Sequence, residues 1–295
     1  MASVGISLLT CNLAEYPGHC KATEFALRSL LDSDLQDHEW ALQIVDNGST
    51  CGATRKLLQQ TSTAIFADRI HVHWAGLNLG IGGGRNLAYQ MLEEWRGPDF
   101  VVEVHTDHVF PQLWLTPLLD RLQDPAYAGY GILGPSLVTG GGEWRAPRFW
   151  LDYDRNYEEF RSELELAADL HRADNRVMPG LTHPCVIRWT MVEALNERDA
   201  QGRLCLYDPY MPGRQNFEDT ELCFRAHKAG WGLGIDFASV VYHHYHYSRL
   251  TGALNAIHGQ GYNSNYVYVV EKHGSDDWLR FQGELGHWLE AAFAR

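Results

Sequence analysis

The sequence lacks the features that mark disulfide-rich, membrane-spanning and exported proteins. Its six cysteines form no CxxC pair, and a chain of 295 residues needs no disulfide framework, so we expect reduced and mostly buried thiols. No window reaches about 18 uncharged apolar residues, which excludes a membrane-spanning helix. The opening MASVGISLLT has no basic region and fits a first strand better than a signal peptide. We therefore expect a cytoplasmic protein, with any membrane contact peripheral and at the inner face.

Positive charge is also scarce. The chain has 24 Lys and Arg against 37 Asp and Glu, which gives a formal net charge of -13. This balance argues against a general nucleic-acid or anionic-membrane binder, although it allows a local basic patch around a phosphate. Hydrophobic residues make up 45% of the chain, enough for a full core, and no linker or repeat divides it. We expect one domain over residues 1–295.

Strand and helix patterns alternate through the first 110 residues. Apolar runs predict strands, and helical spacing predicts helices between them. The expected strands cover 4–10, 40–45, 70–74 and 100–104, and the expected helices cover 22–31, 53–60 and 86–95. This order indicates an α/β fold with a mostly parallel sheet and helices on both faces. Ligands of such sheets bind beyond the carboxyl ends of the strands, so residues 1–110 are predicted to form the nucleotide-binding half.

The rest of the chain is less regular. We expect an acceptor-binding half over residues 111–250 and a C-terminal helical extension over 251–295. Helices are predicted over 158–170, 219–229 and 277–294, and a strand over 239–247. Residues 135–211 are expected to contact the acceptor. The candidates are Trp144, Arg145 and Trp189, and the tryptophan rings could stack on sugars.

Small polar residues follow the first two expected strands. Thr10 and Asn12 come after the first, where an ordinary turn is the simpler interpretation. Asp46 lies in the turn Val45–Ser49 after the second. Its carboxylate could accept a hydrogen bond from a base or a ribose, or could cap the next helix.

A glycine-rich segment, Asn78–Asn86, runs into the third helix. Bare backbone beside a helix N-terminus suits anions, and Arg85 could reach a phosphate. The segment is not the dinucleotide fingerprint, because Arg85 stands where that pattern needs its last glycine, and it is not a P-loop. The alternative is a flexible turn.

Two acidic segments carry candidate chemistry. Glu103–His108 follows the fourth strand and gathers metal-ligand types, with a buried capping aspartate as the alternative. Glu218 and Asp219 open a helix, where one carboxylate could be a general base, or both could be ordinary first-turn acids.

Three histidines stand within four positions near the end of the expected strand 239–247. His243, His244 and His246 follow an apolar run, and along a strand His244 and His246 share a face. This density favours a site over a histidine that only fills the core.

In this order, the segments resemble the inverting family-2 glycosyltransferases of the GT-A fold. The counterparts of that family's motifs are Asn12, Val45–Ser49, Asn78–Asn86, Thr106–His108, Glu218-Asp219 and His243 or His244. The resemblance covers residues 4–274. The family's metal motif ends in an aspartate, where this chain has His108, and Asp107 matches the preceding aspartate.

The resemblance implies transfer of a sugar from a nucleotide-diphosphate donor, most simply a UDP-sugar, to a hydroxyl acceptor with inversion. Asp219 would be the base, with Glu218 as second choice. The implied donor-binding residues are Thr10, Asn12, Asp46, Asn78, Gly80, Arg85, Asn86, Thr106 and Asp107. Asp107 would hold either the ribose or the metal.

His108 with His243, His244 or His246 would bind a divalent metal, Mn²⁺ better than Mg²⁺, because imidazole prefers softer ions. Activity would then fall below about pH 6.5 as histidines protonate. Two alternatives stay open: a retaining transferase or nucleotidyltransferase on the same fold, and a non-catalytic protein that binds sugar nucleotides or glycans.

Overall fold

The computed structural model describes residues 2–16, 18–63, 68–95, 97–139, 156–172, 176–214, 216–244 and 262–293. Trp144, Arg145 and His246 lie outside these ranges, so their expected roles are not addressed below. No helix of the described part combines the length and apolarity needed to cross a bilayer.

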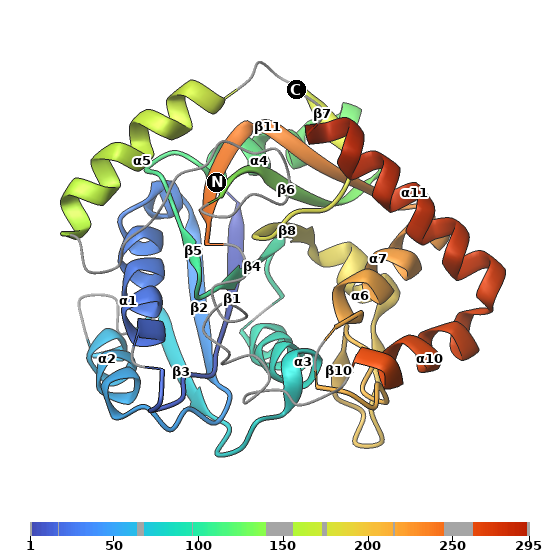
Figure 1. Cartoon of the computed structure of the whole chain (residues 1–295), viewed down its shortest axis with the longest axis horizontal. Helices are drawn as coiled ribbons and strands as arrows, with labels where there is room; N and C mark the ends of the chain where they lie inside the picture. Colours follow the sequence, from blue (N-terminus) through green and yellow to red (C-terminus); the bar gives the residue numbers. More distant parts are fainter. Residues whose placement is uncertain are drawn as a thin grey trace.

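One mixed sheet organises the molecule (Figure 1). In the described residues it has nine strands: β1 Ser3–Thr10, β2 Glu39–Asp46, β3 Ile70–Trp74, β4 Phe100–His105, β5 His108–Val109, β6 Tyr130–Thr139, β7 Val177–Pro179, β8 Cys185–Arg188 and β11 Gly232–His243. A separate hairpin joins β9 Glu197–Arg198 to β10 Leu204–Cys205.

The strand order is β3-β2-β1-β4-β8-β6-β11-β5, with β7 beside β11. β3, β2, β1 and β4 pair in parallel, and β6 pairs in parallel with β11. β8 lies antiparallel between β4 and β6, so those two strands share one direction. The mostly parallel sheet predicted from the sequence is therefore confirmed, with β5, β7 and β8 running the opposite way.

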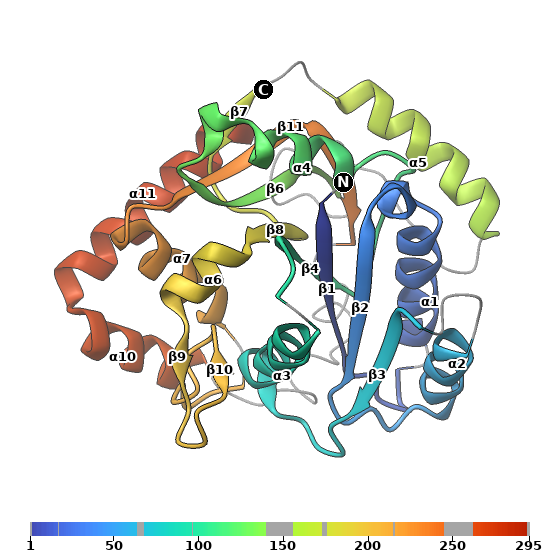
Figure 2. The same ribbon diagram turned by 180° about the vertical axis from the view of Figure 1, so that it is seen from behind.

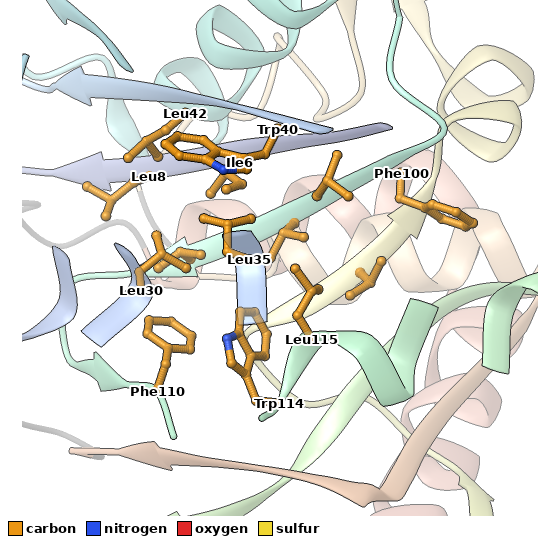
Figure 3. Close-up of a cluster of buried hydrophobic side chains, with 14 of the residues drawn as sticks. Ile6, Leu8, Leu30, Leu35, Trp40, Leu42, Phe100, Phe110, Trp114 and Leu115 are labelled. Atoms are coloured by element: carbon orange, nitrogen blue, oxygen red, sulfur yellow. The ribbon is translucent and has the colours of Figure 1, made fainter. Parts of the chain in front are cut away.

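Alternate side chains of the central strands enter a core on one face of the sheet. Val4, Ile6 and Leu8 of β1 pack there with side chains from α1 (Gly18–Leu31) and α4 (Leu115–Gln123). Figure 3 shows Trp40, Phe110 and Trp114 in the same cluster. This core fixes the strands whose carboxyl ends carry the polar residues.

A second core fills the other face, where Tyr89, Leu92 and Val101 pack. It is covered by α3 Gly80–Glu94, α6 Trp189–Leu195, α7 Glu218–Lys228, α10 Tyr262–His273 and α11 Ser275–Phe293. Figures 1 and 2 show α6, α7, α10 and α11 together on one side of the molecule, while α1 and α2 (Gly52–Ser62) lie on the other. Helices therefore cover both faces, as predicted.

Three differences from the sequence-based expectations are the most informative. The glycine run is the first part of α3 and not a loop before it. β11 begins at Gly232 and not at Ser239, because it pairs with β6 along most of its length, across an irregularity between Asp236 and Val240. Within the expected C-terminal helical extension, residues 262–273 form a helix of their own, α10, which was not predicted individually.

Candidate functional site

The carboxyl ends of three parallel strands meet at one edge. Thr10 pairs with Asp46, and Leu9 pairs with His105, so the residues that follow β1, β2 and β4 lie side by side. His108 of β5 pairs with His243 at the end of β11. The structure therefore brings together the strand ends that the sequence placed at one site.

Histidine rings are stacked at this edge. The ring of His105 lies 5.0 Å from those of His108 and His183, measured between centroids, and both pairs are nearly parallel. The ring of His243 meets that of His108 edge-on at 4.8 Å. Ligand atoms of His105, Asp107 and His108 lie within 4.8 Å of one another, and His243 Nε2 lies 3.6 Å from Asp107 Oδ2.

Burial makes most of these imidazoles neutral. It lowers the pKa of His105 and of His108 well below the usual value, with smaller contributions from neighbouring positive charge. Burial also lowers the pKa of His244 to about 4. Burial is the largest single influence on Asp107 and favours its neutral form, but the charge and hydrogen bond of His243, with smaller contributions from His105 and the backbone, together lower the pKa of this carboxyl to about 2. The edge thus presents the ionised carboxylate of Asp107 beside the neutral imidazoles of His105 and His108.

The two adjacent carboxylates at the start of α7 differ in exposure. Glu218 is 6% exposed, and its Oε2 has no hydrogen-bond partner among the described residues. Burial and the neighbouring charge of Asp219 raise the pKa of Glu218 well above its usual value, which favours the neutral form of this carboxyl. The Asp219 side chain is 39% exposed, and its Oδ2 lies 3.5 Å from His183 Nε2. Only Asp219 is therefore suited to accept a proton from a bound molecule.

The residues after β1 and β2 form a closed turn. Asp46 is 1% exposed, and its Oδ1 accepts a hydrogen bond from the Ser49 N–H at 3.2 Å. Burial raises the pKa of Asp46. Thr10 is also buried, and its hydroxyl has no hydrogen-bond partner in the described part of the chain. Thr106 is half-buried in the turn between β4 and β5.

Arg85, which was expected to contact a phosphate, is buried and forms hydrogen bonds within the fold. It is 1% exposed. Its guanidinium donates to the carbonyl and hydroxyl of Ser7 and, at 2.8 Å, to the carbonyl of Val104. It therefore ties β1 to β4 beneath α3.

Three asparagines expected to bind the donor instead hold loops together. The Asn12 amide donates to the carbonyl of His19 and to the hydroxyls of Thr23 and Thr54. Asn86 exchanges two hydrogen bonds with the Tyr207 backbone. The Asn78 side chain accepts from the Gly80 N–H at 2.8 Å. Donor binding by these side chains is not supported, because their amides are already engaged in the fold.

Gly80 is required for a different reason than anion binding. Its φ of +79° favours glycine, and a Cβ there would lie 2.9 Å from Arg214 Cα. The Arg214 backbone also accepts the Ile81 N–H. A cavity of about 380 Å³ opens beside this crossing, between the first turns of α3 and the segment after β10. Gly82, Asp208, Met211 and Glu218 are among its lining residues.

Trp189 lies at the opposite end of the sheet, which corrects its expected role in acceptor binding. Its backbone N–H donates to the carbonyl of Asp99, just before β4 begins. Its side chain is 8% exposed and packs in the second core. It is a core residue, far from the edge where β4 ends.

Sequence reasoning missed His105 and His183. His105 was visible within Glu103–His108 but was passed over for the aspartate beside it. His183 stands in a segment without a readable pattern, and β8 carries it to the site by inserting between β4 and β6. Its only signal was the apolar run Cys185–Ile187 that follows it.

Comparison with solved structures finds the same fold. S. aureus TarS (residues 1–349) superposes with a TM-score of 0.53 at 13% identity, over 86% of this chain and 64% of TarS. GalNAc-T7 with UDP, GalNAc and Mn²⁺ gives 0.60 at 14% identity, over 92% of this chain and 48% of that one. TarS in complex with UDP-GlcNAc gives 0.52 at 14% identity, over 81% and 58%. The chain thus spans less than two thirds of these proteins, and the likeness confirms the GT-A fold.

The sequence itself matches no curated protein. The profile of the family described as "Glycosyl transferase family 2" matches residues 19–176, which is more than half of the chain. The matched segment contains the ends of β2 and β4 with Asp46, His105 and Asp107. The chain therefore belongs to glycosyl transferase family 2.

Proposed function

We propose that this protein transfers a sugar from a nucleotide-diphosphate donor, a UDP-sugar, to a hydroxyl acceptor with inversion at the anomeric carbon. One observation carries the proposal. The half-exposed carboxylate of Asp219 lies at the same site as the group formed by His105, Asp107 and His108. His183 joins them, because it stacks on His105 and faces Asp219.

The donor class is supported by what related structures contain. TarS was solved with UDP and with UDP-GlcNAc, and GalNAc-T7 with UDP, GalNAc and Mn²⁺. In this chain the donor would lie over the ends of β1, β2 and β4, next to Thr10 and Thr106. Two arginines act on this edge through their charge, since Arg214 favours the ionised form of Cys11 just after β1 and Arg55 favours that of Asp46.

Asp107 and His243 are the residues best suited to hold a divalent cation. One carboxylate with neutral nitrogen donors fits Mn²⁺ better than Mg²⁺. His108 is the weaker candidate, because its Nδ1 accepts the His105 N–H at 3.1 Å. That bond places the ring hydrogen on Nε2 and leaves no lone pair for a cation. When bound, the cation would offset negative charge on the leaving diphosphate.

Asp219 is the general base of the proposed reaction. It takes the proton of the acceptor hydroxyl as that oxygen attacks the anomeric carbon from the face opposite the diphosphate. The carbon–oxygen bond to the diphosphate breaks in the same displacement, so the configuration inverts. Glu218 is the weaker candidate for this role, because it is buried and its pKa is raised. The acceptor would approach through the cavity beside α3, which Glu218 also lines.

The test is a panel of UDP-sugars, assayed for donor hydrolysis and transfer with Mn²⁺ and with Mg²⁺. Asp219→Asn should lower turnover about 10²-fold or more, the scale of general-base loss, and leave UDP affinity intact. Asp276→Asn is the matched control, because it removes an exposed carboxylate from the first turn of another helix. Equal loss of UDP affinity in Asp219→Asn would show that the residue is structural.

The same assay separates the alternatives. A product that keeps the donor's anomeric configuration would indicate a retaining enzyme, in which Asp219 is less critical. Binding of UDP-sugars without hydrolysis or transfer under any condition would indicate a non-catalytic binding protein.

A further inference from the structure

A buried group of side chains lies behind Asp219. Glu103 of β4 and Cys185 of β8 are partners across the two strands, and His183 stands two residues before Cys185. One ligand-type atom from each lies within 4.8 Å of the others. Glu103 and Cys185 are each 1% exposed, so the group is closed to solvent except through His183.

Hydrogen bonds already occupy the carboxylate of this group. Tyr89 donates to Glu103 Oε1 at 2.8 Å, and Tyr207 donates to Oε2 at 2.6 Å. Burial and the charge of Glu103 raise the pKa of both phenols well above the usual value, so they keep their protons. With both oxygens taken, the group is better described as a hydrogen-bonded network than as a cation site.

The network fixes the direction of the hydrogen bonds around His183. Cys185 Sγ lies 3.7 Å from His183 Nδ1, within range for a thiol. Burial and the charge of Glu103 raise the pKa of the Cys185 thiol, so it stays protonated and can donate. An imidazole that accepts at Nδ1 carries its hydrogen on Nε2. That atom is the one that faces Asp219 Oδ2, at 3.5 Å.

We propose that His183 is a positioning residue: it accepts the Cys185 thiol hydrogen at Nδ1 and directs its Nε2–H at Asp219 Oδ2, leaving Oδ1 to take the acceptor proton. The inference rests on the proposed role of Asp219. His105 holds the plane of the His183 ring by stacking on it, with 16° between the rings. The 3.5 Å separation is long, and contacts of this kind commonly tighten when substrates bind.

The experiment compares His183→Phe with His183→Gln. Phenylalanine keeps a ring that can stack on His105 but has no donor, whereas the glutamine amide can place an N–H near the position of Nε2. We expect His183→Phe to lower kcat about 10- to 100-fold, as the loss of one hydrogen bond to a charged group would, with KM for the UDP-sugar within about twofold. His183→Gln should recover most of the lost kcat.

Cys185 supplies a second pair of variants. Cys185→Ser keeps a donor and should retain kcat, whereas Cys185→Val should lower it, because the hydrogen on the His183 ring is then free to move to Nδ1. The melting temperature and UDP affinity of each variant are measured alongside, since a purely structural role would change them first.

Three results would overturn the inference. His183→Phe could keep the full kcat of an active wild-type enzyme, or His183→Gln could be as impaired as His183→Phe. Alternatively, elemental analysis could find one zinc ion per wild-type chain that is lost in Cys185→Ser, which would make the group a metal site. Wild-type protein that turns over no UDP-sugar would instead overturn the proposed function itself.

Discussion

His244 offers a direct test of the buried histidine edge through the pH dependence of folding. It is 5% exposed, directly follows β11, and donates its backbone N–H to the carbonyl of Asp107 at 2.9 Å. Burial lowers its pKa from 6.5 to about 4. The unfolded chain therefore takes up a proton at this ring near pH 6.5, while the folded chain does not until about pH 4.

The sign and size of the effect follow from proton linkage. The stabilisation associated with neutral His244 is fully present above pH 6.5 and is lost as the pH falls from 6.5 toward 4. Between pH 7 and pH 5 the loss is about 2 kcal/mol, taken from about 1.4 kcal/mol per pKa unit. This is a large share of the roughly 5–15 kcal/mol of a typical domain. The lowered pKa values of His105 and His108 add to it with the same sign.

The assay is urea-induced unfolding at several pH values between 7 and 5, where few carboxylates titrate. The expectation is that His244→Gln flattens the pH dependence of the unfolding free energy by about 2 kcal/mol over this range. His287→Gln is the control, because the His287 side chain is 84% exposed, and it should leave the dependence unchanged. Identical pH dependence in wild type and His244→Gln would refute the reasoning.

Three further outcomes are expected. Asp107→Ala should abolish the Mn²⁺ binding detected by electron paramagnetic resonance; undiminished binding would place the ion elsewhere. Arg85→Met should lower the unfolding free energy by about 2 kcal/mol or more, because buried carbonyls lose their donor, yet keep UDP affinity; the opposite pattern would restore Arg85 to the donor site. Gly80→Ala should lose about 1–3 kcal/mol in denaturant titrations, because its positive φ and the nearby Arg214 backbone oppose a side chain, and an unaffected midpoint would contradict this account.

The strands of the first half were predictable because their signals are local. β3 begins and ends at the predicted residues, β1 and β4 differ by a single residue at one end, and β2 differs by one residue at each end. In each case an apolar run is bounded by polar turn residues, so the residues next to each strand in the sequence are enough to predict where it begins and ends. The same locality made the polar strand ends readable, and parallel pairing then brings them to one edge.

The α3 glycines show where local reasoning fails. Glycine has low helix propensity, which predicted a loop. Packing determines the outcome instead, since a Cβ at Gly84 would overlap the Leu9 side chain, and a Cβ at Gly82 would press on Tyr207. The same closeness explains Arg85, whose guanidinium turns inward to the carbonyl groups of β1 and β4. Contacts between distant segments determine both the helical conformation of these glycines and the direction of the Arg85 side chain, and a single sequence does not reveal such contacts.

The place of β8 has a consequence for how the chain assembles. β8 lies between β4 and β6, although it is synthesised after both of them. Until residues 185–188 leave the ribosome, β4 and β6 each keep an edge of unpaired N–H and C=O groups, the arrangement that recruits foreign strands. A chain that ends at residue 176, before β8, would keep those edges permanently. We expect it to self-associate, because four late residues close the middle of the sheet.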